Sequence, residues 1–375
     1  MFGQKKYRRF LCLFFVFTPL LCGMAAAVNY YIDPMWCFRH ANRYNGVQCD
    51  IDDRQQKTNY LKCRAGEGYD TLMIGNSRVM LMNQNDFGPH TFNYAVAGML
   101  PIEFPEYINY AKKVNGKSFQ RIVIGLSFAP TNEECSYFAG KAPSYYFKNA
   151  DNPLYRYGLL FSRDVLNKSL YNYHNSSRFG VTVYTDRYNV RHVRKERVKL
   201  EENLRANLED TVNSYRNHFR YLEGYRSILE SIKKDNPGTD FKVFTTPVSK
   251  PLFCAVVNEG RLPDYERWLR ESVEVFGEVQ HFEYLNSVTR NYQSYYMDGH
   301  HYYPEAGTLI AHKVMGVADQ AIPADFGMLV TRANIDEKLK EIEASAAECA
   351  VTAGGKAPAG LALPAPATGK STAAP

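Results

Sequence analysis

Four short apolar runs, each ending in small or turn-forming residues, constrain the fold of this chain more than any other feature. They read TLMIGNS (71–77), TFNYAVAG (91–98), RIVIGLSF (121–128) and FKVFTTPV (241–248). Short, often β-branched runs of this kind are expected of parallel strands that are buried on both faces. Because helix-like segments lie between them, the βαβαβ order predicts a doubly wound α/β sheet.

The segment after Arg197 predicts one long amphipathic helix that packs on this sheet. Its apolar residues recur at steps of three and four, and the turn sequence NPG at 236–238 ends the pattern. This apolar stripe consists of Leu200, Leu204, Leu208, Val212, Tyr215, Phe219, Leu222, Tyr225, Leu229 and Ile232. A chain of 375 residues, 45% of them hydrophobic, is long enough to bury a sizeable core.

An apolar stretch from Phe10 to Val28 directly follows a cluster of basic residues. Its length is close to the roughly twenty residues with which a helix crosses a bilayer, and a basic flank stays in the cytoplasm. We expect residues 1–28 to be an uncleaved single-pass anchor; the alternative is a signal sequence cleaved after Ala25 and Ala27. Either reading sends the remaining chain out of the cytoplasm. The net charge of +6 lies partly in this flank, so it does not indicate a nucleic-acid-binding protein.

Two further segments depart from the sheet pattern. Residues 29–333 form the main domain, but about 136–190 is an insertion rich in tyrosine and asparagine, which we expect over or beside the site. Its tyrosines either stack on sugar rings or wedge the insertion onto the domain. Residues 334–375 are expected to form a short charged helix and, from about Ser345, a disordered tail rich in Ala, Pro and Gly.

The eight cysteines match no zinc or CxxC spacing, so no metal site is expected. Two lie in the apolar stretch and Cys349 lies in the tail. In an oxidising compartment, one or two disulfides of undetermined pairing are expected among the other five, with free buried thiols as the alternative. These five are Cys37, Cys49, Cys63, Cys135 and Cys254.

Three of the four apolar runs place Ser77, Gly98 and Ser127 at their ends. Since ligands bind beyond the carboxyl ends of parallel strands, these residues are expected in one crevice. A base appears in YYMDGHHYYPEAG (295–307), where Asp298 and His301 are three residues apart. One loop can thus hold the carboxylate against one imidazole nitrogen while the other faces a serine hydroxyl. The alternative is that Ser77 merely caps a helix.

Ser…Asp…His with Asp-x-x-His in the last block resembles the SGNH/GDSL hydrolase superfamily, with IGNSR at the nucleophile block. The closer resemblance is to its membrane-anchored, cell-envelope branch, proteins similar to DltD and to alginate O-acetylation proteins. There the nucleophile motif often reads Gly-x-Ser-Arg and the last block Asp-x-x-His-Tyr-x-Pro-Glu-x-Gly, which this chain matches from Asp298 to Gly307. The resemblance covers roughly residues 30–325.

This resemblance implies a flavodoxin-like three-layer α/β/α sandwich, the SGNH hydrolase fold. It makes Ser77 the nucleophile, His301 the general base and then acid, and Asp298 the orienting carboxylate. The oxyanion hole would use the backbone N–H groups of Ser77 and Gly98. The superfamily commonly adds an asparagine side chain, whereas here Ser127 stands at the nearest place.

Three further residues are candidates for substrate binding. Asn132 lies further out than Ser127 in the same block. Arg78 is either a salt-bridging surface residue or a contact to an anionic substrate. His300 is expected in a solvent-facing part of the loop, next to the base. Tyr302 and Pro304 are expected to serve in packing and in the turn.

The function implied by the resemblance is that of an extracytoplasmic serine acyltransferase or esterase that needs no cofactor. It would add or remove acetyl groups on a cell-envelope polysaccharide through an acyl-Ser77 intermediate, from the periplasmic side of the inner membrane. A membrane-bound O-acyltransferase is the partner expected to deliver the acyl group. The alternative is a non-catalytic scaffold or glycan-binding subunit of a polysaccharide modification or export complex.

Overall fold

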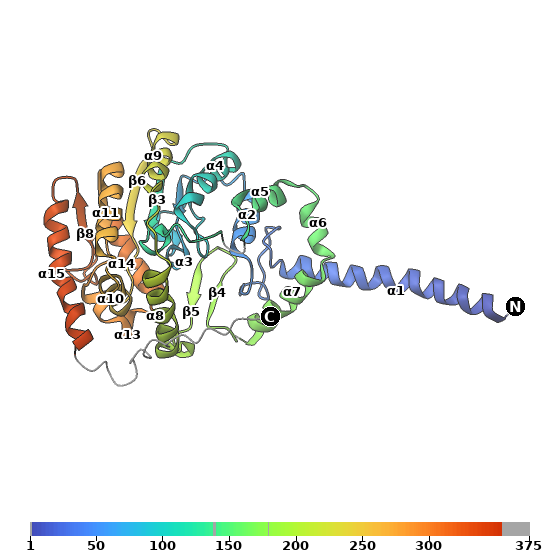
Figure 1. Ribbon diagram of the computed structural model, residues 1–375. Coiled ribbons are helices and arrows are strands. Elements are labelled where there is room, and N and C mark those ends of the chain that lie inside the picture. The colour runs from blue at the N-terminus through green and yellow to red at the C-terminus, as the bar shows by residue number, and fades with distance from the viewer. Residues whose placement is uncertain (1, 138–139, 179, 355–375) are drawn as a thin grey trace, which may run out of the picture.

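The computed structural model describes residues 2–137, 140–178 and 180–354 (Figure 1). A six-stranded sheet in the order β2-β1-β3-β6-β7-β8 lies at its centre, with β8 alone antiparallel to its neighbour. The strands are β1 (Thr71–Ile74), β2 (Thr91–Asn93), β3 (Arg121–Leu126), β6 (Asp240–Thr245), β7 (Glu278–His281) and β8 (Met328–Thr331). The α/β class and the mostly parallel sheet predicted from the four apolar runs are confirmed.

Helices account for most of the remaining described chain. They are α1 (Phe2–Ile32), α2 (Asp53–Cys63), α3 (Ser77–Met80), α4 (Phe104–Asn115), α5 (Pro143–Asp151), α6 (Tyr155–Leu160), α7 (Arg163–Arg178), α8 (Leu200–Asn217), α9 (Tyr225–Asp235), α10 (Lys250–Asn258), α11 (Leu262–Phe276), α12 (Ser287–Arg290), α13 (Tyr292–Tyr295), α14 (Pro304–Met315) and α15 (Ile335–Gly354). A separate hairpin pairs β4 (Val183–Thr185) with β5 (Arg191–Val193).

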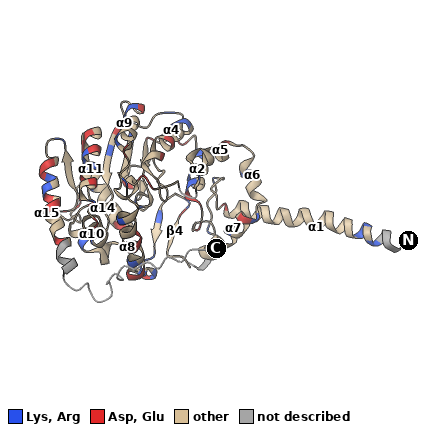
Figure 2. Ribbon diagram, viewed as in Figure 1, with Lys and Arg blue, Asp and Glu red and all other residues tan. Residues whose placement is uncertain are grey.

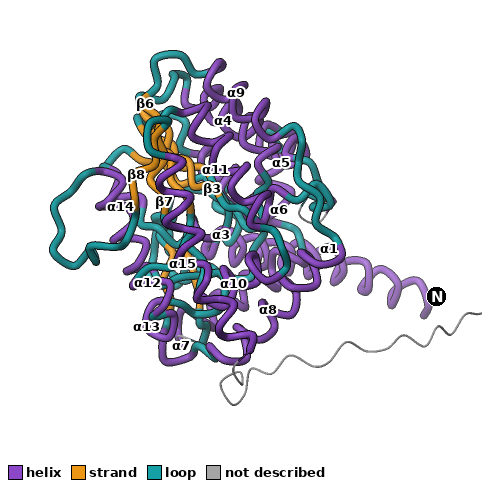
Figure 3. The backbone as a smooth tube through the Cα atoms, turned by 60° about the vertical axis from the view of Figure 1, so that its left-hand side comes forward, coloured by secondary structure: helices purple, strands orange, loops and turns teal. Residues whose placement is uncertain are grey.

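Both faces of the sheet are buried because successive strand residues point to opposite sides. Leu72 and Ile74 of β1 belong to a large apolar core with α4, α9 and α11, whereas Met73 between them belongs to a smaller core with α14. Figure 3 shows α14 on one side of the strands and α4, α9 and α11 on the other. The result is three layers of helix, sheet and helix.

The prediction of one long helix after Arg197 is wrong, because the chain forms α8 and α9 with a break between them. In the break, the backbone N–H of Leu222 donates to the carbonyl of Thr131 at 2.8 Å, and Tyr221 forms a β-bridge with Asn132. These tertiary hydrogen bonds replace those of a continuing helix. The apolar period runs on through the break because both helices pack on the same core.

The N-terminal helix α1 passes the predicted boundary at residue 28 and ends at Ile32. From Lys6 to Ile32 it is apolar and long enough to cross a membrane. Figure 2 shows its basic residues near its start, with a long uncharged stretch between them and the globular body. A membrane anchor or a signal sequence therefore fits this helix by length and composition.

The insertion lies near the base of α1. Helices α6 and α7 pack on α1, and α5 packs on α2 (Figure 1). Two of the three helices of the insertion therefore lie against α1. The hairpin turn that follows them reaches the β2 edge, where Asn189 donates to the carbonyl of Asn93 at 2.9 Å.

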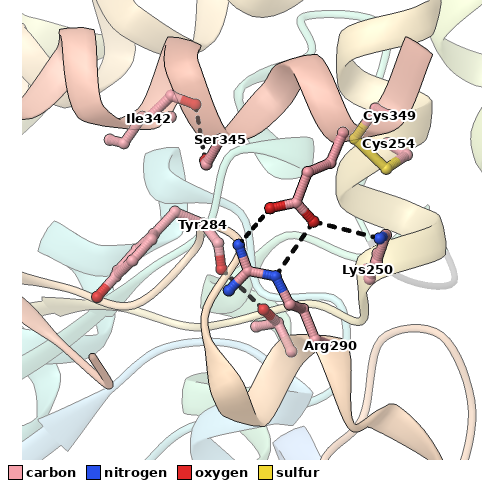
Figure 4. Close-up of a disulfide and its surroundings, with 9 residues drawn as sticks. Lys250, Cys254, Tyr284, Arg290, Ile342, Ser345 and Cys349 are labelled. Carbon is pink, nitrogen blue, oxygen red and sulfur yellow. Dashed lines mark hydrogen bonds and ion pairs between the residues drawn. A yellow bond between two sulfur atoms is a disulfide. The ribbon is translucent and has the colours of Figure 1, made fainter. Parts of the chain in front are cut away.

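The prediction that disorder begins near Ser345 is wrong for residues 345–354, because α15 continues through them. Two contacts hold this part of α15 on the domain: Cys349 forms a disulfide with Cys254 of α10 (Figure 4). Glu348 also pairs with Arg290 at 2.6 Å. Residues 355–375 lie outside the described part of the chain. The prediction of disulfides among the five cysteines is therefore wrong, because Cys254 pairs with the tail residue Cys349. Cys37, Cys49, Cys63 and Cys135 are free thiols.

This disulfide closes a chain loop with a sequence separation of 95 that contains α14 and the segment 295–307. A cross-link over so long a loop lowers the entropy of the unfolded chain and so favours the folded one. It therefore secures the part of the chain that carries the candidate base.

Candidate active site

The turn after β1 is built so that Ser77 begins a helix at the end of the strand. Gly75 is needed there because a Cβ at this position would lie 2.4 Å from Cγ2 of Val79. Asn76 is the N-cap of α3, and its side-chain oxygen accepts from the backbone N–H of Arg78 at 3.1 Å. The alternative that Ser77 caps the helix is therefore wrong, since Asn76 takes that role.

The structure brings Ser77, His301 and Asp298 together in one hydrogen-bonded chain. Ser77 Oγ lies 2.7 Å from His301 Nε2, and His301 Nδ1 lies 2.8 Å from Asp298 Oδ2. Because Nδ1 faces a carboxylate, it carries the ring proton of the neutral imidazole. Nε2 is then the acceptor for the serine hydroxyl, as a general base requires.

Asp298 is held by three hydrogen bonds from its own loop. Its Oδ1 accepts from the backbone N–H groups of His300 and His301, both at 2.7 Å, in addition to the imidazole on Oδ2. Burial acts to raise the pKa of this carboxyl, but the hydrogen bonds and the nearby imidazole outweigh burial and lower it below its usual value. Asp298 is thus ionised at neutral pH and fixes the orientation of His301.

Gly98 lies in the left-handed region, with φ of 59°, in the turn after β2. Arg54 of α2 donates to the carbonyls of Ala97 at 3.1 Å and Gly98 at 3.2 Å, and pairs with Glu103 at 2.8 Å. In a trans peptide the N–H points opposite to the carbonyl. Since the Ala97 carbonyl faces Arg54, the Gly98 N–H points away from Arg54. This buried ion pair, which sequence reasoning missed, orients the second candidate oxyanion donor.

Ser127 enters a buried network instead of facing the triad. Its hydroxyl accepts from Asn76 Nδ2 at 2.9 Å and lies 2.6 Å from the hydroxyl of Thr246, which follows β6. The network links the ends of β1, β3 and β6 beneath the turn that carries Ser77. The prediction that Ser127 donates to an oxyanion has no support from these hydrogen bonds.

Arg78 is buried, so of its two predicted roles the one as a salt-bridging surface residue is wrong. Its guanidinium donates to Thr246 at 2.9 Å and to His300 Nδ1 at 3.4 Å, and its carbonyl accepts from the buried Tyr302 hydroxyl at 2.8 Å. A buried arginine with these partners supports the turn around Ser77 from below. Pro304 opens α14 at its first turn, as expected of a turn residue.

His300 is partly buried, so the prediction that it faces solvent is wrong. Its Nδ1 accepts from Arg78, and its Nε2 lies 3.4 Å from Thr211 Oγ1 of α8. Burial, together with the charge of Arg78, lowers the pKa of His300 to about 3, so the ring is neutral. It joins the loop of the candidate base to α8.

Asn132 is tied to the loop after α8. Its side-chain nitrogen donates to the carbonyl of His218 at 2.8 Å, and its side-chain oxygen accepts from the backbone N–H groups of Arg220 and Glu134, both at 3.1 Å. These contacts hold the break between α8 and α9. The side-chain amide of Asn132 is therefore bound to groups outside the Ser77–His301–Asp298 chain.

A cavity of about 390 Å³, a size typical of ligand sites, lies next to Gly98 and His300. Gly98 and His300 line it together with Thr211 and Tyr215 of α8. Another cavity, of about 310 Å³, lies between α2 and the α5–α6 segment, and its lining contains none of the candidate site residues. The cavity next to Gly98 and His300 is therefore bounded by α8.

Glu283, two residues after the end of β7, is a buried carboxyl that sequence reasoning missed. Burial raises its pKa to about 7, although the charge of Arg78 and the N–H of Phe128 act in the opposite direction. In the unfolded chain its pKa is near 4.5, so between these values the folded state holds a proton that the unfolded state lacks. The resulting contribution to stability is present below pH 4.5 and lost as pH rises through 7.

We therefore expect Glu283→Gln to gain stability relative to wild type as pH rises from 4.5 to 8. The relative gain is about 3 kcal/mol, because each pKa unit corresponds to about 1.4 kcal/mol. Urea denaturation across this pH range measures it. Glu337→Gln, which changes an exposed carboxylate of α15, is the control and should show a flat difference. A flat difference for Glu283→Gln would contradict the prediction.

Within the described residues, no group of three or more His, Cys, Asp or Glu side chains is placed to hold a metal ion. Comparisons of this chain with family models, with curated proteins and with solved structures find no match.

Proposed function

We propose that this chain is a membrane-anchored serine acyltransferase or esterase of the SGNH type. The observation that carries the proposal is the hydrogen-bonded chain Ser77–His301–Asp298 at the carboxyl end of a parallel sheet. A serine needs a base within hydrogen-bond distance to act as a nucleophile, and that base needs its tautomer fixed. His301 is within hydrogen-bond distance of Ser77, and Asp298 is placed to fix the tautomer of His301. Ser77 lies more than two hundred residues before these two in sequence.

In the acylation step, Ser77 Oγ attacks the carbonyl carbon of an ester donor while His301 Nε2 takes the hydroxyl proton. The developing oxyanion is stabilised by the backbone N–H groups of Ser77 and Gly98. His301 then gives its proton to the departing alcohol oxygen, the ester bond breaks, and an acyl group remains on Ser77.

In the second step, a hydroxyl of the acceptor attacks the acyl-enzyme while His301 again removes a proton. If the acceptor is a sugar hydroxyl, the product is an O-acylated glycan; if it is water, the product is the free acid. Exclusion of water after acylation decides between them. The cavity beside Gly98 and His300 is the space for the acceptor.

The cell-envelope location rests on α1 and on the resemblance of the two sequence blocks. With the basic flank in the cytoplasm, residues after α1 lie in the periplasm, where envelope polysaccharides are modified. An acyl donor made in the cytoplasm must cross the membrane, so a membrane-bound O-acyltransferase is the partner we propose.

The test is acylation of the full-length protein in detergent by p-nitrophenyl acetate and by a fluorophosphonate probe. Wild type is expected to release a burst of nitrophenolate and to become labelled, because His301 activates Ser77. Ser77→Ala should lose both signals. Ser294→Ala is the control, since Ser294 is an exposed serine of α13 outside the candidate site, and it should keep both. Labelling that persists in Ser77→Ala would overturn the proposal.

One observation favours the alternative of a non-catalytic glycan-binding subunit. The Ser127 hydroxyl is bound to Asn76 and Thr246, so of the three predicted oxyanion donors only the two backbone N–H groups remain. Under this alternative, neither probe would label wild type, and binding of an envelope polysaccharide would survive Ser77→Ala. The same labelling experiment therefore distinguishes the two functions.

A further inference from the structure

The length of α1 sets where a membrane surface would meet the protein. The apolar stretch from Phe10 to Val28 is about 28 Å long at 1.5 Å per residue, close to the roughly 30 Å hydrocarbon thickness of a bilayer. No charged residue occurs between Arg9 and Asp33. With Phe10 at one surface, the other surface lies at Asn29. This step rests on α1 being the membrane anchor of the proposed function.

Asn29 fixes the short helix α6 at this level. The side chain is buried, and its nitrogen donates to the carbonyls of Leu160 at 2.9 Å and Ser162 at 3.2 Å, at the end of α6. Its oxygen accepts from Ser169 of α7 at 2.9 Å. Figure 1 shows α6 at the edge of the globular body from which α1 emerges. A bilayer that surrounds α1 would therefore contact α6.

The side chains at this edge are large and apolar. Leu154 is 70% exposed and Phe161 is 64% exposed, one at each end of α6, with Tyr157 between them at 47%. Burying one such side chain is worth about 1.5–3 kcal/mol, so their exposure to water forgoes that free energy. Tyr30 and Tyr31, at the end of α1, are also about half exposed. Tyrosines at this depth suit the boundary between lipid and water.

We propose that α6 is a second membrane contact, with Leu154, Tyr157 and Phe161 inserted at the lipid–water boundary on the side opposite the basic flank. The occupant of this surface is lipid and not a partner protein, because the surface is continuous with the lipid-facing part of α1. Two exposed arginines, Arg156 between Leu154 and Tyr157 and Arg163 just after Phe161, match the phosphate layer. Two contacts hold the domain in one orientation, whereas α1 alone would let it rotate.

Single tryptophans report this depth in the full-length protein reconstituted into vesicles with and without dibrominated lipid, which quenches nearby indoles. Phe161→Trp tests α6, and Leu154→Trp reports independently at its other end. Phe17→Trp, in the exposed part of α1, reports whether the anchor is inserted. Tyr188→Trp is the control in water, since Tyr188 is 68% exposed on the β4–β5 turn. The native Trp36 and Trp268 are buried and supply the background measured in wild type.

Phe17→Trp, Phe161→Trp and Leu154→Trp are expected to be quenched with a blue-shifted emission, and Tyr188→Trp to be unchanged. Quenching at Phe17→Trp without quenching at either α6 reporter would overturn the second contact and leave the anchor standing. No quenching at Phe17→Trp would overturn the anchor and, with it, the premise of the second contact. Neither result depends on the chemistry of Ser77.

Discussion

Asp298→Asn is expected to slow acylation by p-nitrophenyl acetate by on the order of 10⁴-fold. The amide is close in size to the carboxylate but has only one acceptor oxygen and carries no charge. It cannot accept both from His301 Nδ1 on one side and from the two backbone N–H groups on the other. The imidazole then loses the tautomer that leaves Nε2 able to accept the Ser77 proton, and the imidazolium formed in the transition state loses its counter-charge.

The measurement is the burst rate constant of full-length protein, with the melting temperature recorded in parallel. Asp319→Asn is a matched control, because Asp319 holds His312 Nδ1 at the same distance of 2.8 Å, away from the serine. It should keep the wild-type burst. Equal burst rates for Asp298→Asn and wild type would show that the Asp298–His301 contact has no part in the chemistry.

The sequence was enough to place Ser77, Asp298 and His301 because each depends on a local rule. A serine after a buried apolar run lies at a strand end, and an Asp-x-x-His spacing lets one loop join two side chains. Their meeting then follows from the parallel order of the strands. His300 and Arg78 were misplaced because their burial depends on α8 and on Thr246, which no local pattern links to the segment 295–307.

The buried ion pair between Arg54 and Glu103 could not be predicted from the sequence for the same reason. Helix α2 reads DRQQKTNYLKC, a polar sequence that looks solvent-exposed, yet every residue from Arg54 to Leu61 is buried. The break between α8 and α9 was missed because the apolar period continues through it. Strand β7 was missed because its four residues, EVQH, show no strand pattern and are extended only through tertiary contacts. The disulfide of Cys349 was missed because this residue lies in an alanine-rich segment that shows no pattern of its own.

Arg54→Met is expected to lower the free energy of unfolding by about 3–5 kcal/mol, the largest stability effect predicted for this chain. Arg54 and Glu103 are both at most 1% exposed, so removing the cation leaves a buried carboxylate without a counter-charge. Burial already acts to raise the pKa of Glu103, and Arg54 opposes that rise. Urea denaturation at pH 7 measures the loss. Arg121→Met, which breaks the partly exposed pair with Asp240, should cost at most about 1 kcal/mol.

The double variant Arg54→Met/Glu103→Leu separates charge from geometry. Replacing both partners removes the unpaired carboxyl, so most of the stability should return. Acylation of Ser77 should not return with it, because the carbonyls of Ala97 and Gly98 still lack the guanidinium that orients the Gly98 N–H. A double variant that regains stability and the wild-type burst would show that the Gly98 turn holds its conformation without Arg54. Recovery of stability alone would identify Arg54 as a positioning residue for the oxyanion donor.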